Sequence, residues 1–155
     1  MIMLDKITQQ DFLNREWVKR LLDAGVDMSD AKYYLADDPG HLITEIFPRD
    51  IIEVEAFKKV WVDVVPTYTV SELYYKLHEY IYLTIDGEEF SGGLHSLKDA
   101  PFYLAYYHLE NKDKTKWNED LFACFEFPIY SFAGLLIQCH RHGVGDAGDI
   151  RSKWK

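Results

Sequence analysis

The hydrophobic period changes from two to 3.6 within residues 64–81, VVPTYTVSELYYKLHEYI. The run that ends at Pro66 is rich in β-branched residues, which is typical of a strand, whereas apolar residues after Thr69 recur every three or four positions. Thr69 and Glu72 have the spacing of a capping box, in which each side chain accepts a hydrogen bond from the other residue's amide. This switch favours folds that combine strands with helices. The segment predicts a helix over residues 70–81, with an apolar face made of Val70, Leu73, Tyr74, Leu77, Tyr80 and Ile81.

Two further segments show helical periodicity. Residues 9–24 place apolar side chains on one side, with Thr8 as the expected N-cap and Gly25 as the residue that ends the helix. Residues 131–142 form the second such stripe. The apolar positions are Leu13, Trp17, Val18, Leu21 and Leu22 in the first helix, and Phe132, Leu135, Leu136 and Cys139 in the second.

The remaining apolar runs resemble strands joined by short turns. Residues 31–36 and 41–47 flank Asp38-Pro39-Gly40, a turn in which glycine is expected to supply a positive φ, and Asp86-Gly87 predicts another turn. One or both of the runs 51–57 and 60–65 are expected to extend the sheet, and 101–109 and 121–127 to add two strands. Because both faces of 101–109 are apolar or aromatic, we expect a central strand or one that meets a partner.

Strands separated from helices, with hairpin-length connections, favour an α+β fold. We therefore expect a mostly antiparallel sheet packed against about three helices. Residues 1–143 are predicted to form a single domain, and residues 144–155 a mobile C-terminal tail.

The charge of the chain argues against two classes of partner. Its 26 acidic and 17 basic residues give a formal net charge of −9, which repels nucleic-acid backbones and anionic membrane surfaces. The lysines at 112, 114 and 116 are interleaved with Asp113 and predict a solvated loop. No apolar stretch has the roughly 20 residues that a membrane-spanning helix needs. The two cysteines, Cys124 and Cys139, are expected to be free thiols in a reducing cytosol, so the predicted location is cytoplasmic.

The spacing Gly143-x-Gly145-x-x-Gly148 resembles a dinucleotide-binding loop. That loop requires a strand before it, a helix after it and an acidic residue about 20 positions further on. Here a predicted helix precedes Gly143, and only seven residues follow Gly148. We therefore interpret Gly143 as the residue that ends the helix, and predict no cofactor.

Few residues suggest catalysis or metal binding. On a helix, His140 and His142 point about 200° apart and cannot close on one ion with Cys139, so no metal site is predicted. Both cysteines are expected in the core, where a thiol is inert. His108 together with a carboxylate offers the alternative of a small acidic hydrolase. Because no spacing defines a catalytic group, a non-enzyme is the preferred interpretation.

Tyrosine is the remaining compositional excess, with 11 residues among the 155. Tyrosine is enriched in protein interfaces because it buries a rigid ring and keeps a polar tip. The two-faced segment PFYLAYYHL, residues 101–109, contains Tyr103 and Tyr107, which form our candidate interaction surface. We expect a protein-binding or accessory module that contacts another protein or itself, and the acidic balance favours a basic partner.

Three stretches together resemble a known group of sequences: KYYLAD at 32–37, VVPTYTVSELYYKLHEYI at 64–81 and FPIYSFAGLLIQCHRHG at 127–143. The chain resembles, over residues 10 to 143, a loose group of small uncharacterised proteins from gut-anaerobe genomes and their prophages. This resemblance implies an α+β fold and a mobile-element context, and no activity or catalytic residue. The segment 45–61, EIFPRDIIEVEAFKKVW, departs from the shorter pattern of that group and leaves the number of strands open.

Overall fold

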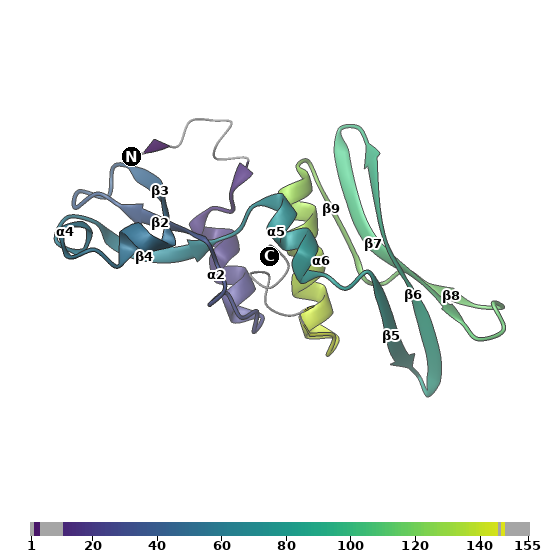
Figure 1. The fold of residues 1–155 in the computed structure, drawn as a ribbon. Helices are drawn as coiled ribbons and strands as arrows, with labels where there is room; N and C mark the ends of the chain where they lie inside the picture. Colours follow the sequence, from purple (N-terminus) through teal and green to yellow (C-terminus); the bar gives the residue numbers. More distant parts are fainter. Residues whose placement is uncertain (1, 4–10, 146, 148–155) are drawn as a thin grey trace.

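The computed structural model describes residues 2–3, 11–145 and 147. Within these residues the chain forms two antiparallel sheets, with a layer of helices between them (Figure 1). The α+β class expected from the sequence is confirmed. There are two sheets where we expected one.

The first sheet contains four strands in the order β1-β3-β2-β4. Asp38 organises the β2–β3 turn, because one of its carboxylate oxygens accepts hydrogen bonds from the amides of Leu42 and Ile43, both at 2.8 Å. The predicted hairpin is confirmed, but the positive φ in its turn belongs to His41, at 56°, and not to Gly40. Pro66 is tolerated because it lies in an edge strand. The strands are β1 (Ile2–Met3), β2 (Tyr33–Asp37), β3 (Thr44–Pro48) and β4 (Val62–Thr67).

The expectation that one or both of the runs 51–57 and 60–65 extend the sheet is met by the second run, most of which lies in β4. The first run, 51–57, does not form a strand. This region contains two short helices, α3 (Arg49–Ile52) and α4 (Glu55–Lys58). Between residues 51 and 60, Phe57 is the one buried side chain. The centroid of its ring lies 4.8 Å from that of the Phe47 ring. A strand would have buried alternate residues against a neighbour. One helical turn is enough to bury the single ring of Phe57 against Phe47. Tertiary packing therefore overrides the strand that the β-branched residues favour.

The helix layer contains α2 (Arg15–Asp23), α5 (Val70–Lys76) and α6 (Pro128–Arg141). Helix α2 begins later than predicted because Asn14 is its N-cap, accepting a hydrogen bond from the Trp17 amide at 3.0 Å. The expected cap, Thr8, lies outside the described residues. Helix α6 begins three residues earlier than predicted, because Pro128 occupies its first turn, where a proline costs no hydrogen bond.

Helix α5 has the predicted capping box between Thr69 and Glu72. However, it ends at Lys76, and the predicted extension to residue 81 is wrong. Leu77 is extended, with φ −85° and ψ 140°, and residues 80–85 form a strand that pairs with β6. The helical spacing of Tyr80 and Ile81 is thus coincidental, since pairing with β6 determines their conformation.

Gly143 ends helix α6 as predicted, with a φ of +80°. The Val144 amide donates to the Cys139 carbonyl at 2.8 Å and the Gly143 amide to the His140 carbonyl at 3.2 Å, the two bonds of a Schellman motif. Beyond it, the Ala147 amide donates to the Lys76 carbonyl at 2.8 Å. The rest of the expected tail, residues 146 and 148–155, lies outside the described residues.

The second sheet has five strands, with the order β5-β6-β7-β8 and β9 paired to β7. Strand β7 is central, as expected for residues 101–109. Asp86 and Gly87 form the predicted turn, both with positive φ, 50° and 80°. The strands are β5 (Tyr80–Ile85), β6 (Glu88–Asp99), β7 (Phe102–Asn111), β8 (Trp117–Asn118) and β9 (Phe122–Phe125).

A buried ion pair lies within the helix layer. Lys76 of α5 donates to Asp30 at 3.0 Å, and their side chains are 3% and 4% exposed. Lys76 also donates to the Asp27 carbonyl at 3.2 Å, and the Tyr68 hydroxyl donates to Asp30. The network therefore joins the loop after α2 to the end of β4 and to α5.

We predict that Lys76→Met destabilises the fold by about 3–5 kcal/mol, because it leaves the Asp30 carboxylate buried without its cation. Chemical denaturation measures this loss. The control is Lys19→Met, which removes a pair at 2.7 Å whose side chains are 75% and 64% exposed. This control is expected to change stability by less than about 1 kcal/mol. Equal losses in the two variants would contradict a special role for the buried pair.

Candidate functional site

The two faces of the five-stranded sheet have different surroundings. Strand alternation directs Ile81, Phe90 and Leu109 toward the helices, where they join the main core. Strand alternation directs the opposite side chains away from this core. Figure 1 shows no described helix on that side of the sheet. Tyr82 is 80% exposed there and Trp117 is 70% exposed. We call this surface the open face: Tyr80, Tyr82, Leu97, Phe102, Tyr106, Trp117 and Phe122.

The predicted surface residues Tyr103 and Tyr107 lie on the other side of β7. Tyr107 is fully buried, its hydroxyl donates to the His78 carbonyl at 2.5 Å, and burial raises its pKa above the ordinary range. Tyr103 is half-buried, with its ring 5.9 Å from that of Phe132 in α6. Tyr107 therefore cannot present its ring to a partner in this fold. The neighbouring Tyr106 lies on the open face, one residue from the position that the sequence suggested.

We predict that Tyr107→Ala behaves as a core truncation and lowers the free energy of unfolding by about 3–5 kcal/mol. In contrast, Trp117→Ala is expected to change it by about 0.5 kcal/mol or less, because the indole is mainly solvated. Thermal or urea unfolding of the two variants separates the cases. A small effect of Tyr107→Ala would mean that its ring is accessible after all.

His108 also lies on the open face, between two carboxylates. Its Nδ1 is 2.6 Å from Glu119 and its Nε2 is 3.2 Å from Glu110. The hydrogen bonds to Glu119 and Glu110 raise the pKa of the imidazole above its usual 6.5. A general base needs an unprotonated nitrogen that faces a substrate. Both ring nitrogens of His108 already contact carboxylates, so this geometry favours an ion-paired imidazolium and gives the hydrolase alternative no support.

We predict an NMR titration midpoint for His108 above 6.5, which falls toward that value in Glu119→Gln. Because the pKa is raised in the folded state, the ion pairs stabilise the fold fully below pH 6.5 and this contribution is lost as pH rises through the raised pKa. Glu89→Gln is the matched control, and should leave the midpoint unchanged. A midpoint at or below 6.5 would show that the carboxylates do not hold the proton.

The two cysteines differ in environment, and both are free. Cys139 is buried as expected, and burial raises its pKa to about 12. The prediction that Cys124 lies in the core is wrong, because this thiol is exposed. Cys124 pairs with Leu104 in the register of β9 with β7, which directs it to the same side as the open face. Strand parity, which the short apolar run does not reveal, decides this difference.

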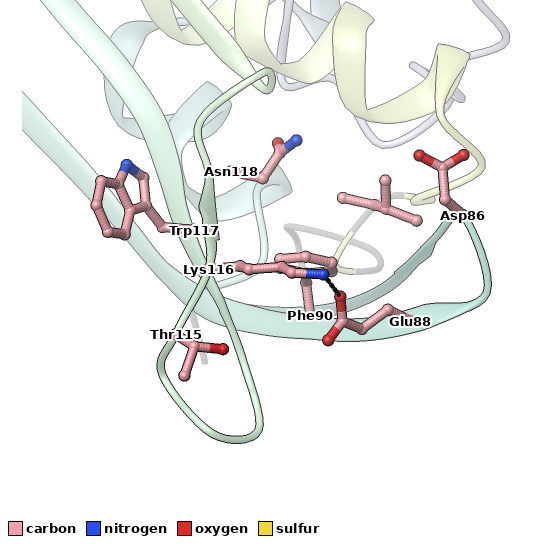
Figure 2. A pocket seen from close by; sticks show the side chains of 8 residues that line it. Asp86, Glu88, Phe90, Thr115, Lys116, Trp117 and Asn118 are labelled. Atoms are coloured by element: carbon pink, nitrogen blue, oxygen red, sulfur yellow. Dashed lines mark hydrogen bonds and ion pairs between the residues drawn. The ribbon is translucent and has the colours of Figure 1, made fainter.

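A cavity of about 520 Å³ lies at one end of the same sheet (Figure 2). Within it, Lys116 is 3.3 Å from Glu88, which also accepts from the Asn111 amide group at 3.0 Å. These bonds, with that of Asn111 the strongest, lower the pKa of Glu88. Figure 2 shows Trp117 pointing away from Lys116, on the other side of the strand. Glu88 and Lys116 thus neutralise each other where the ends of two hairpins line the cavity.

Cys139, His140 and His142 do not form a metal-binding group. Among the described residues, three side chains of metal-ligand type do bring their ligand atoms together. They are Asp37, His41 and Asp63, in the four-stranded sheet. No spacing in the sequence indicates this group, because its members come from two strands and a turn.

Comparisons with family models, with curated proteins and with solved structures give no match to this chain. Among the described helices, none has the length and apolar character needed to cross a membrane.

Proposed function

We propose that the protein is a non-enzymatic binding module that contacts a basic protein partner through the open face. The supporting observation is that seven large apolar side chains share one side of a sheet whose other side packs against the helices. Tyrosine and tryptophan dominate the energetics of protein interfaces. Rigid strands hold these rings in place, so that binding orders few side chains.

The charge distribution supports a basic partner. The alternation of β6 and β7 places Glu89 and Glu110 on the side of the open face, and Glu119 contacts His108 on that side. The whole chain has a net charge of −9. Acidic groups around an aromatic surface accelerate association with a cationic protein, and they oppose pairing with a second copy or with nucleic acid.

The biological setting is part of the same proposal. The resemblance to proteins of gut anaerobes and their prophages implies an accessory role in a mobile element. The exposed free thiol of Cys124 is compatible with a reducing, cytoplasmic environment.

The proposal predicts that Tyr82→Ala and Trp117→Ala each reduce capture of the partner about fivefold or more, equivalent to about 1 kcal/mol per interface ring. Tagged protein is used to capture partners from a lysate of the source organism, at low and at high salt. The captured protein is expected to be basic and to dissociate as salt increases. Leu42→Ala is the control, because Leu42 is 88% exposed in the β2–β3 turn, away from the open face.

Cys124 provides an independent measurement on the wild-type chain. Its exposed thiol should react with a maleimide, whereas the buried Cys139 should not, and bound partner should slow this reaction. Capture that is equal in the open-face variants and the control would contradict the proposal. A dimer in sedimentation that is lost in Trp117→Ala would identify a second copy as the partner and would also overturn the basic-partner proposal.

A further inference from the structure

Three ligand-type side chains converge at the end of the four-stranded sheet where β2 turns into β3. Asp37 is the last residue of β2, His41 lies in the β2–β3 turn, and Asp63 lies in β4 beside an irregularity in its pairing with β2. The Nδ1 atom of His41 is 3.4 Å from Asp37 Oδ2 and 3.2 Å from Asp63 Oδ2. All three ligand atoms lie within 4.8 Å of one another.

These distances match the spacing of atoms around a metal ion. Bonds of about 2.1 Å to an ion place neighbouring ligand atoms about 3.0 Å apart in octahedral geometry and about 3.4 Å apart in tetrahedral geometry. A charge-assisted hydrogen bond is shorter, at about 2.7–2.9 Å. Both contacts of His41 are longer than the optimum for a charge-assisted hydrogen bond, and both fall in the range of ligand-atom separations around one ion.

His108 provides a comparison within the same chain. Its two carboxylates contact different ring nitrogens, Nδ1 and Nε2, which lie on opposite sides of the imidazole. They cannot meet on one ion. At His41 both carboxylates approach the same nitrogen, Nδ1, which can donate only one hydrogen bond at its best geometry. The second carboxylate therefore lacks an optimal hydrogen bond from this nitrogen, and a cation between the three groups would supply its positive partner.

Groups outside the cluster hold the Asp37 carboxylate in the orientation that coordination needs. Its Oδ1 accepts from the Thr44 hydroxyl at 2.6 Å and lies 2.9 Å from the Arg15 guanidinium. Oδ2 is the atom that faces His41. Outer contacts of this kind are typical of metal-ligating carboxylates, which they orient.

The charge and accessibility of the cluster also suit a cation. Asp37, Asp38 and Asp63 are close along the two strands and their turn, and Arg15 is the cation paired with Asp37, which leaves two negative charges. The Asp37 carboxylate is held by the Arg15 guanidinium at 2.9 Å and the Thr44 hydroxyl at 2.6 Å, both on Oδ1. His41 and Asp63 are 56% and 61% exposed, which leaves an entry path for an ion.

We propose that Asp37, His41 and Asp63 form a binding site for one divalent transition-metal cation of the Zn²⁺ or Mn²⁺ type. One imidazole nitrogen with two carboxylates favours these ions over Ca²⁺ and Mg²⁺, which prefer oxygen ligands alone. Water fills the remaining coordination positions. The site is separate from the open face and independent of the proposed binding function.

The test is calorimetric titration of Zn²⁺ into the protein carrying Cys124→Ser, which removes the exposed thiol as a competing ligand. We expect one equivalent to bind, with affinity reduced about tenfold or more in His41→Asn and in Asp63→Asn. Asparagine is chosen because His41 and Asp63 have positive φ values of 56° and 52°, which asparagine tolerates. His108→Asn is the matched control and should bind within about twofold of the parent.

Mn²⁺ provides a second readout through paramagnetic broadening of NMR signals. The amides around Asp37, His41 and Asp63 should broaden first, and His41→Asn should abolish the effect. Absence of Zn²⁺ binding up to about 1 mM would overturn the proposal. Equal weakening by His108→Asn, or broadening centred elsewhere, would also overturn it. Circular dichroism of each variant confirms that the fold is intact before titration.

Discussion

The Lys76–Asp30 ion pair connects the segments that lead into the two sheets, namely the loop before β2 and the helix before β5. Both charges are almost completely removed from water, so neither can lose its partner without a large desolvation penalty. Tyr68 and the Asp27 carbonyl complete the arrangement. The network holds the end of α5 in place, and α5 leads directly into β5, the first strand of the five-stranded sheet. Forming a buried pair adds little net stability, because both charges must leave water, but removing one partner is costly.

The layer of helices then creates the asymmetry of the five-stranded sheet. Helix α6 packs closely on β9, where an added Cβ at Gly134 would lie 2.9 Å from the Phe125 ring. This contact covers the inner face and leaves the other face to solvent. The resulting separation places the aromatic surface and the Asp37–His41–Asp63 cluster in different sheets. Protein binding and cation binding can therefore be altered independently by substitutions.

Local signals in the sequence were reliable where the chemistry is local. The Thr69–Glu72 capping box, the Asp86-Gly87 turn and the helix-ending Gly143 depend on neighbouring residues, and all three are present. Elements that depend on a distant partner were less predictable. The segment 51–57 has a strand-like composition but forms two short helices, because Phe57 packs on Phe47. Similarly, Tyr80 has helical spacing but joins β5, because β6 supplies the hydrogen bonds.

The candidate sites show the same division. The sequence indicated that residues 101–109 form a strand with two apolar faces, and it offered His108 with an unspecified carboxylate as an alternative site. It did not distinguish Tyr106 from Tyr107, since both faces of the strand have similar side chains. It gave no sign that Cys124 would be exposed or that Asp37 and Asp63 would approach one nitrogen of His41.

The sequence by itself determined the α+β class, the acidic charge and the local starts and ends of several elements. These properties follow from composition and from contacts within a few residues. The tertiary structure alone decided that there are two sheets, which face of β7 is covered, and which polar groups converge. Pairing register and helix packing set these features, because a shift of one residue along a strand moves every side chain to the opposite face.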